Sequence, residues 1–243
     1  MLGGYTWATK IDSSSKIIEL NVYLLLSAQR TIPLPGGEEA TVEMNSEMPF
    51  NGNTSFKLNA PSGWKWIFRL PCPEYATNIQ ISEKTTQENG FMVVNLRGEG
   101  QCQLEMNFEL PIQILASHPL TGQDNLTIRR GPIVYVAESI DNKLEADYPH
   151  FAGLGIKSSS LPRMDMEKIT IENLEVMAIT IPDEEVYAAQ MIGEAAFGLV
   201  GKQGARKWEK VVGGLKLVPW FARANRGGAG HVRASLLRVD EDA

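Results

Sequence analysis

The chain has 243 residues, of which 43% are hydrophobic and 8% aromatic, and its formal net charge at pH 7 is −6. This composition is that of an ordinary globular protein with one large or two small domains. The acidic balance argues against a nucleic-acid-binding surface, and no run approaches the roughly 20 apolar residues that cross a bilayer. Residues 1–7 lack the charged start and apolar run of a signal peptide, which favours a cytoplasmic location.

The first part of the chain alternates between apolar and polar residues. Along residues 103–110 every second side chain is apolar, and the same alternation occurs at 42–44, 56–58 and 64–70. It also places Leu24 and Leu26 on the apolar face that begins at Ile18. Side chains alternate between the two faces of a strand, so the pattern predicts half-buried strands separated by turns such as Asn89-Gly90. Roughly six or seven such strands predict an antiparallel sandwich over residues 1–116.

A second sandwich is predicted over residues 117–224, with strands at 133–137, 169–171 and 177–181. The polar, Gly-, Ser- and Pro-containing stretch 141–163 predicts loop. Residues 183–200 have a helix-forming composition, and we expect at most a short helix there. Residues 232–237 alternate as a strand, which must pair with a sheet to satisfy its backbone groups. The predicted class is therefore all-β, with two antiparallel, jelly-roll-like β-sandwich domains.

Two phrases carry a family resemblance. Residues 129–138 read RRGPIVYVAE, and residues 217–228 read LVPWFARANRGG. In this order they resemble the C-terminal region of the β-L-arabinofuranosidase-like glycoside hydrolases (glycoside hydrolase family 127 and its relatives). The chain departs from the family phrases at Val136, where relatives often carry Cys, and at Arg223, where they often carry Trp. The resemblance implies sandwiches that accompany an N-terminal (α/α)6 catalytic barrel, and a final strand, within residues 225–243, that returns to the first sandwich.

The resemblance also implies where the chemistry resides. Family members are understood to use a cysteine nucleophile held by zinc, with adjacent cysteines and glutamates that belong to the barrel region. This chain has only Cys72 and Cys102, which are far apart in sequence. A structural or catalytic zinc site needs about four converging ligands, which two lone thiols do not supply. We therefore expect no catalytic residue, no metal site and no cofactor in this chain, and we expect the cysteines to be buried free thiols rather than a disulfide.

The charged residues of the two phrases suggest structural roles. A glycosidase needs two carboxyl groups across a sugar-sized cleft, whereas most acidic residues here alternate along strands or cluster in loops. Glu138 differs because it follows an apolar strand, and we expect it to anchor a neighbouring arginine or loop backbone. Arg130 and Arg226 each stand beside a glycine, and a guanidinium group can satisfy several carbonyls or a carboxylate at once. With Asn225, these residues are predicted to form a structural junction between the domains.

The aromatic residues admit a sharper alternative. Sugar-binding sandwiches stack exposed aromatic rings on sugar faces, and the candidates here are Trp64, Trp66 and Trp220. Large aromatic residues on an alternating strand more often fill a core, and core packing is favoured.

We therefore favour a non-catalytic, two-sandwich accessory region of an arabinofuranosidase-like hydrolase, present as a truncated or separately encoded product. One alternative is a stand-alone carbohydrate-binding module that uses exposed aromatic residues. Another is a hydrolase component that becomes active with a barrel on a second chain. An aromatic cleft would support the former, and a large apolar docking patch would support the latter. The expected partners are the (α/α)6 barrel, in cis or in trans, and a carbohydrate, with no nucleic acid or membrane.

Overall fold

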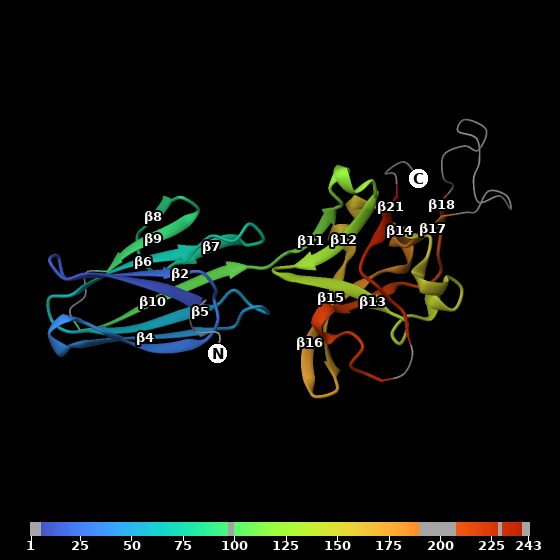
Figure 1. Ribbon diagram of the computed structural model, residues 1–243. Coiled ribbons are helices and arrows are strands. Elements are labelled where there is room, and N and C mark those ends of the chain that lie inside the picture. Colours follow the sequence, from blue (N-terminus) through green and yellow to red (C-terminus); the bar gives the residue numbers. More distant parts are fainter. Residues whose placement is uncertain (1–5, 97–99, 190–207, 228–229, 240–243) are drawn as a thin grey trace. The chain divides into compact units, whose positions relative to one another are not determined.

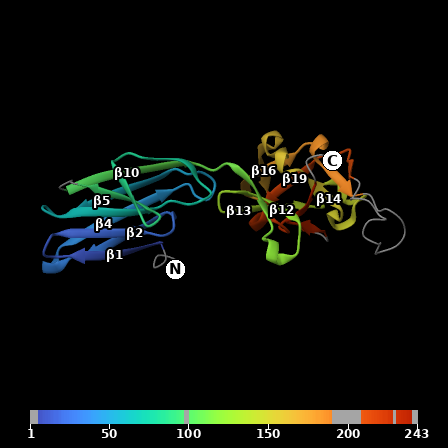
Figure 2. The ribbon, with the colours of Figure 1, turned by 90° about the horizontal axis from the view of Figure 1, so that it is seen from above.

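The computed structural model describes residues 6–96, 100–189, 208–227 and 230–239, and it consists of strands and short 3-10 helices (Figures 1 and 2). The chain divides into two compact units, Met1–Pro111 and Ile112–Ala243. No helix in the described ranges has the length and apolar character needed to cross a membrane. The all-β class predicted from the alternating pattern is confirmed.

The first unit contains two five-stranded sheets. All neighbouring strands within them are antiparallel except β2 and β6, which are parallel. The first sheet has the order β1 (Trp7–Asp12), β2 (Ile17–Val22), β6 (Lys65–Pro71), β9 (Phe91–Leu96) and β8 (Thr85–Glu88). The second has the order β3 (Ala28–Pro33), β4 (Glu39–Ser46), β5 (Thr54–Ala60), β10 (Gly100–Glu109) and β7 (Thr77–Ile81), with the short helix η1 (Pro35–Gly37) between β3 and β4.

One hydrophobic core joins the two sheets of this unit. Strands β4, β5, β6 and β10 contribute alternate side chains to it. For example, the ring of Phe56 from β5 meets that of Phe68 from β6 edge-on, with 5.5 Å between centroids. The expectation that Leu24 and Leu26 continue the buried face of β2 is wrong, because their side chains are 46% and 36% exposed. The strand ends at Val22, and the chain then turns to donate backbone hydrogen bonds to the Thr6 carbonyl, so the alternation no longer describes a strand.

Among its described residues, the second unit is built on one sheet of 11 strands, nine of which follow one another along a single path of paired strands. In spatial order the path is β15 (Asp165–Ile171), β16 (Leu174–Ile181), β19 (Leu215–Pro219), β13 (Ile133–Glu138), β12 (Asn125–Arg130), β21 (Leu236–Arg238), β14 (Leu154–Ile156), β17 (Tyr187–Ala189) and β18 (Trp208–Lys210). Two further strands join its sides: β11 (Ile112–Ala116) pairs with β12, and β20 (Val232–Arg233) pairs with β13. The connections contain η2 (Pro119–Thr121), η3 (Lys143–Glu145), η4 (Pro149–Phe151), η5 (Ser158–Arg163), η6 (Asp183–Glu185) and η7 (Trp220–Ala222).

The path curls around a shared core, since β16 near one end and β17 near the other contribute side chains to the same buried cluster. Strand β13 forms the corner. Its first residues pair with β12 across the tight turn at Gly131, whereas Tyr135 to Ala137 pair with β19. A strand that changes partners in this way lets one sheet fold into two layers. The far end of β13, at Glu138, consequently lies away from the β12 hairpin.

The structure corrects the predicted course of the C-terminal segment. We expected residues 232–237 to return to the first sandwich, but β20 pairs with β13, and β21 pairs with β12 and β14. After β12 and β13 diverge, the β12 edge at Asn125 and Leu126 is open, and β21 pairs with it within the same unit. The units also divide at Pro111, earlier than the expected boundary at residue 116.

The predicted loop over residues 141–163 contains a strand as well as short helices. Strand β14 is fully buried, and its sequence lacks the alternation of apolar and polar residues from which a strand could be predicted. Its central Gly155 allows close packing, because a Cβ atom there would lie 2.8 Å from the Leu237 carbonyl oxygen. In the ambiguous stretch 183–200, residues up to 189 form η6 and β17, and residues 190–200 lie outside the described ranges.

Candidate functional site

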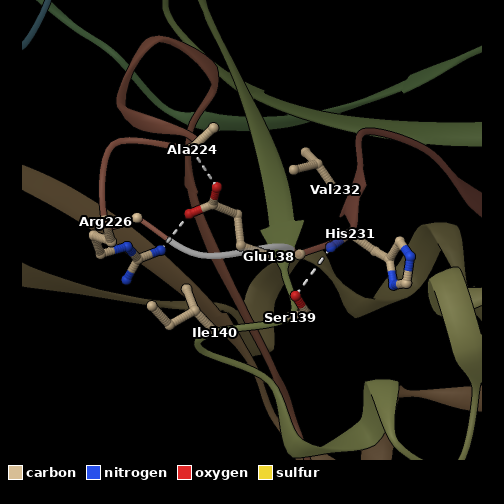
Figure 3. Close-up of a pocket in the computed structure, with 9 residues that line it drawn as sticks. Glu138, Ser139, Ile140, Ala224, Arg226, His231 and Val232 are labelled. Carbon is tan, nitrogen blue, oxygen red and sulfur yellow. Dashed lines mark hydrogen bonds and ion pairs between the residues drawn. The ribbon is translucent and has the colours of Figure 1, made fainter.

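A cavity of about 310 Å³ opens at the end of β13, within the second unit (Figure 3). Glu138 and Ser139 form one side of it. The segments around Arg226 and His231, which are distant in sequence, form the other. The site therefore exists only because the chain returns to β13 after η7.

Glu138 is the central group of this site. Its side chain is 6% exposed, and an unpaired carboxylate at that depth would be costly. The backbone N–H of Ala224 donates to Glu138 Oε1 at 2.5 Å, and the guanidinium group of Arg226 pairs with Oε2. Figure 3 shows both contacts converging on the carboxylate. Glu138 thus holds an arginine and a loop backbone at the same time.

Arg226 binds a second carboxylate through both of its terminal nitrogens. Nη1 lies 2.6 Å from Asp141 Oδ1, and Nη2 lies 2.5 Å from Asp141 Oδ2. The hydrogen bond to Asp141 raises the pKa of Arg226, with a smaller contribution from Glu138, although burial opposes the shift. The guanidinium group therefore remains charged. Together, Glu138, Asp141 and Arg226 form an ion-pair cluster that fastens the loop after η7 to the end of β13.

Asn142 extends the same anchoring into the neighbouring strand. Its buried amide nitrogen donates to the Glu138 carbonyl at 2.7 Å and to the Lys216 carbonyl at 2.9 Å. Its amide oxygen accepts the Lys216 N–H at 2.7 Å. The sequence offers no signal for this role, because nothing local distinguishes Asn142 from the other polar residues of its loop.

A second polar group lies on the His231 side of the cavity. His231 Nδ1 is 2.5 Å from Glu145 Oε1, and its ring centroid is 3.6 Å from that of His150. The backbone N–H of His231 donates to Ser139 Oγ at 3.0 Å. The pKa of Glu145 is lowered, first by the backbone hydrogen bond from His150 and then by the His231 side chain. These contacts fix the entry into β20.

The other residues predicted at a junction lie elsewhere. Arg130 is at the start of the β12–β13 turn, where its side chain hydrogen-bonds the buried Tyr135 and opposes the rise in the Tyr135 pKa that burial causes. Asn225 is exposed, and its side chain makes no hydrogen bond or ion pair with the described residues; it neighbours Arg226 only in sequence. Arg130 and Arg226 are thus at opposite ends of β13, and the cluster around Arg226 belongs to the second unit alone.

The structure corrects the aromatic candidates in the first unit. Trp64 and Trp66 are 3% and 1% exposed and belong to the core, so neither ring can stack on a sugar. The Trp64 indole N–H donates to Glu38 Oε2 at 3.2 Å. Trp220 on η7 differs, because its side chain is 44% exposed, and the Arg223 guanidinium lies 4.3 Å from its ring centroid.

The described residues do not fit the zinc site that the family resemblance implies. In these ranges no group of three or more His, Cys, Asp or Glu side chains is placed to hold a metal ion. Cys72 and Cys102 are free thiols, as expected, but they are only partly buried, which corrects the expectation that they are buried. Partial burial raises the pKa of Cys102. Neither thiol has the converging ligands that zinc requires.

Comparison with known sequences identifies a family domain in the second unit. Residues 112–232 match the glycoside hydrolase family 127 C-terminal domain. The chain carries this family 127 domain. The match confirms the resemblance drawn from the two phrases, and the domain contains Glu138, Asp141 and Arg226. No curated protein matches the chain.

Solved glycoside hydrolases share the fold of the family 127 domain and of the unit before it. One is a family 127 β-L-arabinofuranosidase from Geobacillus stearothermophilus T6, at 18% identity and a TM-score of 0.68, with 98% of this chain and 35% of that chain covered. A second family 127 β-arabinofuranosidase has 19% identity and a TM-score of 0.70, with 98% and 37% covered. A third structure, described as a glycoside hydrolase, has 21% identity and a TM-score of 0.68, with 91% and 36% covered. The chain spans little more than a third of the length of each.

Proposed function

We propose that this chain is a non-catalytic β-sandwich accessory region that supports the catalytic barrel of a family 127 glycoside hydrolase. The observation that carries the proposal is the match of residues 112–232 to the C-terminal domain of that family. The shared fold of a region covering 35–37% of two family 127 arabinofuranosidases agrees with it. The barrel would be supplied in cis or in trans.

The geometry at the end of β13 favours support over catalysis. A glycosidase needs one carboxyl group that can give up a proton and another that acts on the sugar or on water. Glu138 and Asp141 instead share the guanidinium group of Arg226, and Glu138 also accepts the Ala224 N–H. The cluster therefore acts as a clamp on the loop after η7.

The clamp holds η7 at the surface with its aromatic pair outward. Trp220 and Phe221 are 44% and 45% exposed, while Ala222 between this pair and the clamp is fully buried against Val136 and Val218. Exposed large apolar side chains beside one another often mark a contact with another protein surface. We assign this aromatic pair to the contact with the barrel.

The test uses the full chain with and without a separately expressed family 127 barrel. Alone, the chain should not hydrolyse a chromogenic β-L-arabinofuranoside and should hold no stoichiometric zinc by metal analysis. With the barrel it should co-elute in size-exclusion chromatography and raise the barrel's thermal stability. Turnover by the chain alone that disappears with a chelator would contradict the proposal.

A pair of variants tests the assigned contact. A double variant in which both Trp220 and Phe221 are changed to Ala should co-elute less with the barrel. Leu120→Ala provides the matched control, because Leu120 is an apolar side chain of the same unit that is 91% exposed. Equal co-elution of both variants would show that the barrel binds elsewhere.

A further inference from the structure

The outer face of the second sheet in the first unit is polar throughout its central strands. Strands β4, β5 and β10 direct Val42, Phe56 and Leu104 into the core, so the alternate side chains point outward. Many of these outward side chains are amides. We define the amide face by Gln29, Asn45, Asn59, Gln101, Gln103 and Asn107.

The amides lie in cross-strand rows. Asn59 is paired with Thr41 on one side and with Gln101 on the other. In the next row along the strands, Lys57 of β5 is paired with Glu43 of β4 and Gln103 of β10. Directly paired residues on one face have Cβ atoms about 4.5–5.5 Å apart, so each row is a continuous band of polar groups across three strands.

Two hollows adjoin each other on this face. One, of about 180 Å³, is lined by the rows that contain Asn59 and Gln103. The other, of about 350 Å³, is lined by the following rows, which contain Asn45, Ser55 and Asn107. Both lie over β4, β5 and β10 and follow one another along the strand direction, and we call the two hollows together the depression.

Asparagine is depleted in strands, yet Asn45, Asn59 and Asn107 all lie on this face. Within the described ranges, the side chains of Asn59, Gln101 and Gln103 make no hydrogen bond to the protein and are exposed. Each amide offers two N–H donors and an acceptor oxygen. These groups are therefore available for a ligand that presents both donors and acceptors.

The chemistry of the face narrows the class of ligand. A protein partner would have to bury these amides, and each unsatisfied buried amide costs free energy. The central charges are Glu43 and Glu105 against Lys57, so the face does not attract an anionic polymer. Neutral sugars present hydroxyl groups that both donate and accept hydrogen bonds and carry no charge.

We propose that the amide face binds a neutral polysaccharide. The polymer lies in the depression over β4, β5 and β10, where its hydroxyl groups donate to the amide oxygens and accept from the amide N–H groups. This inference concerns the first unit only. It does not depend on the barrel contact proposed for the second unit, and its test needs no barrel.

Affinity electrophoresis of the full chain tests the proposal. Native gels contain arabinan, arabinoxylan or galactomannan as neutral polymers, or polygalacturonate as the anionic one. At least one neutral polymer should retard the chain, and polygalacturonate should not. Absence of retardation by all three neutral polymers, or equal retardation by polygalacturonate, would overturn the proposal.

Variants locate the binding. A triple variant in which Asn59, Gln101 and Gln103 are all changed to Ala should bind the polymer roughly tenfold or more weakly. Each hydrogen bond contributes modestly to the binding free energy, and the side chains that form three of them are removed. The matched control replaces Gln87 and Asn95, exposed amides on the other sheet of the same unit, and should bind like the unmodified chain. Circular dichroism checks that both variants are folded. Unchanged binding by the triple variant would place the polymer elsewhere and refute the assignment.

Discussion

Arg226→Met removes the cation from the ion-pair cluster while keeping a long apolar stem. The Glu138 and Asp141 side chains are 6% and 14% exposed, so both carboxylates lose their partner in a setting where water compensates little. Removing one partner of a buried ion pair typically costs about 3–5 kcal/mol. Glu138 keeps the Ala224 N–H, which sets the expectation at the lower end, about 3 kcal/mol. For a unit of this size that lowers the melting temperature by roughly 10 °C.

Differential scanning calorimetry of the full chain measures the effect. The transition of the second unit should shift, and that of the first should not. Lys168→Met is the control, because Lys168 and Glu175 form a pair whose side chains are 62% and 65% exposed, and such pairs contribute about 1 kcal/mol or less. Adding Glu138→Gln to Arg226→Met should recover part of the loss, since it removes one uncompensated charge. An Arg226→Met shift no larger than that of Lys168→Met would refute the clamp.

Trp66→Ala should destabilise the first unit by about 3–5 kcal/mol in urea unfolding, because the ring is buried, whereas Trp66→Phe should cost clearly less. Equal and small losses would contradict its place in the core. Leu236→Ala should lower the unfolding free energy of the second unit alone by about 2–5 kcal/mol. A shift in the unfolding transition of the first unit would instead indicate that residues 232–237 pair with the first sandwich. The pKa of Asp12 is lowered from 3.8 to about 2, mainly by the Ser14 hydroxyl. Its folded pKa lies below its unfolded pKa, so the stabilisation is present above about pH 4 and is lost as the pH falls towards 2. NMR titration of the Asp12 carboxyl group measures this pKa, and Ser14→Ala should raise it. An unshifted Asp12 pKa in the unmodified chain would count against this prediction.

Local patterns were sufficient for the fold class and for the family. The alternation along residues 103–110 became β10, whose inward side chains Leu104, Met106 and Phe108 are buried. This succeeded because period two is a property of the strand itself and does not depend on its neighbours. The position of Glu138 after an apolar strand likewise marked it as a carboxylate that needs a partner.

Pairing and burial depended on the tertiary structure. Arg226 meets Glu138 across 88 residues, and β21 pairs with the edge of β12 that is open beyond the β13 turn. Alternation shows which side chains share a face, but it does not show which face is covered or which edge is open. The alternation at Trp66 therefore favours a core role without excluding sugar binding, and the opposing sheet decides the matter by covering the ring. Such choices are made by contacts between distant segments, whose free energies no local window of residues contains.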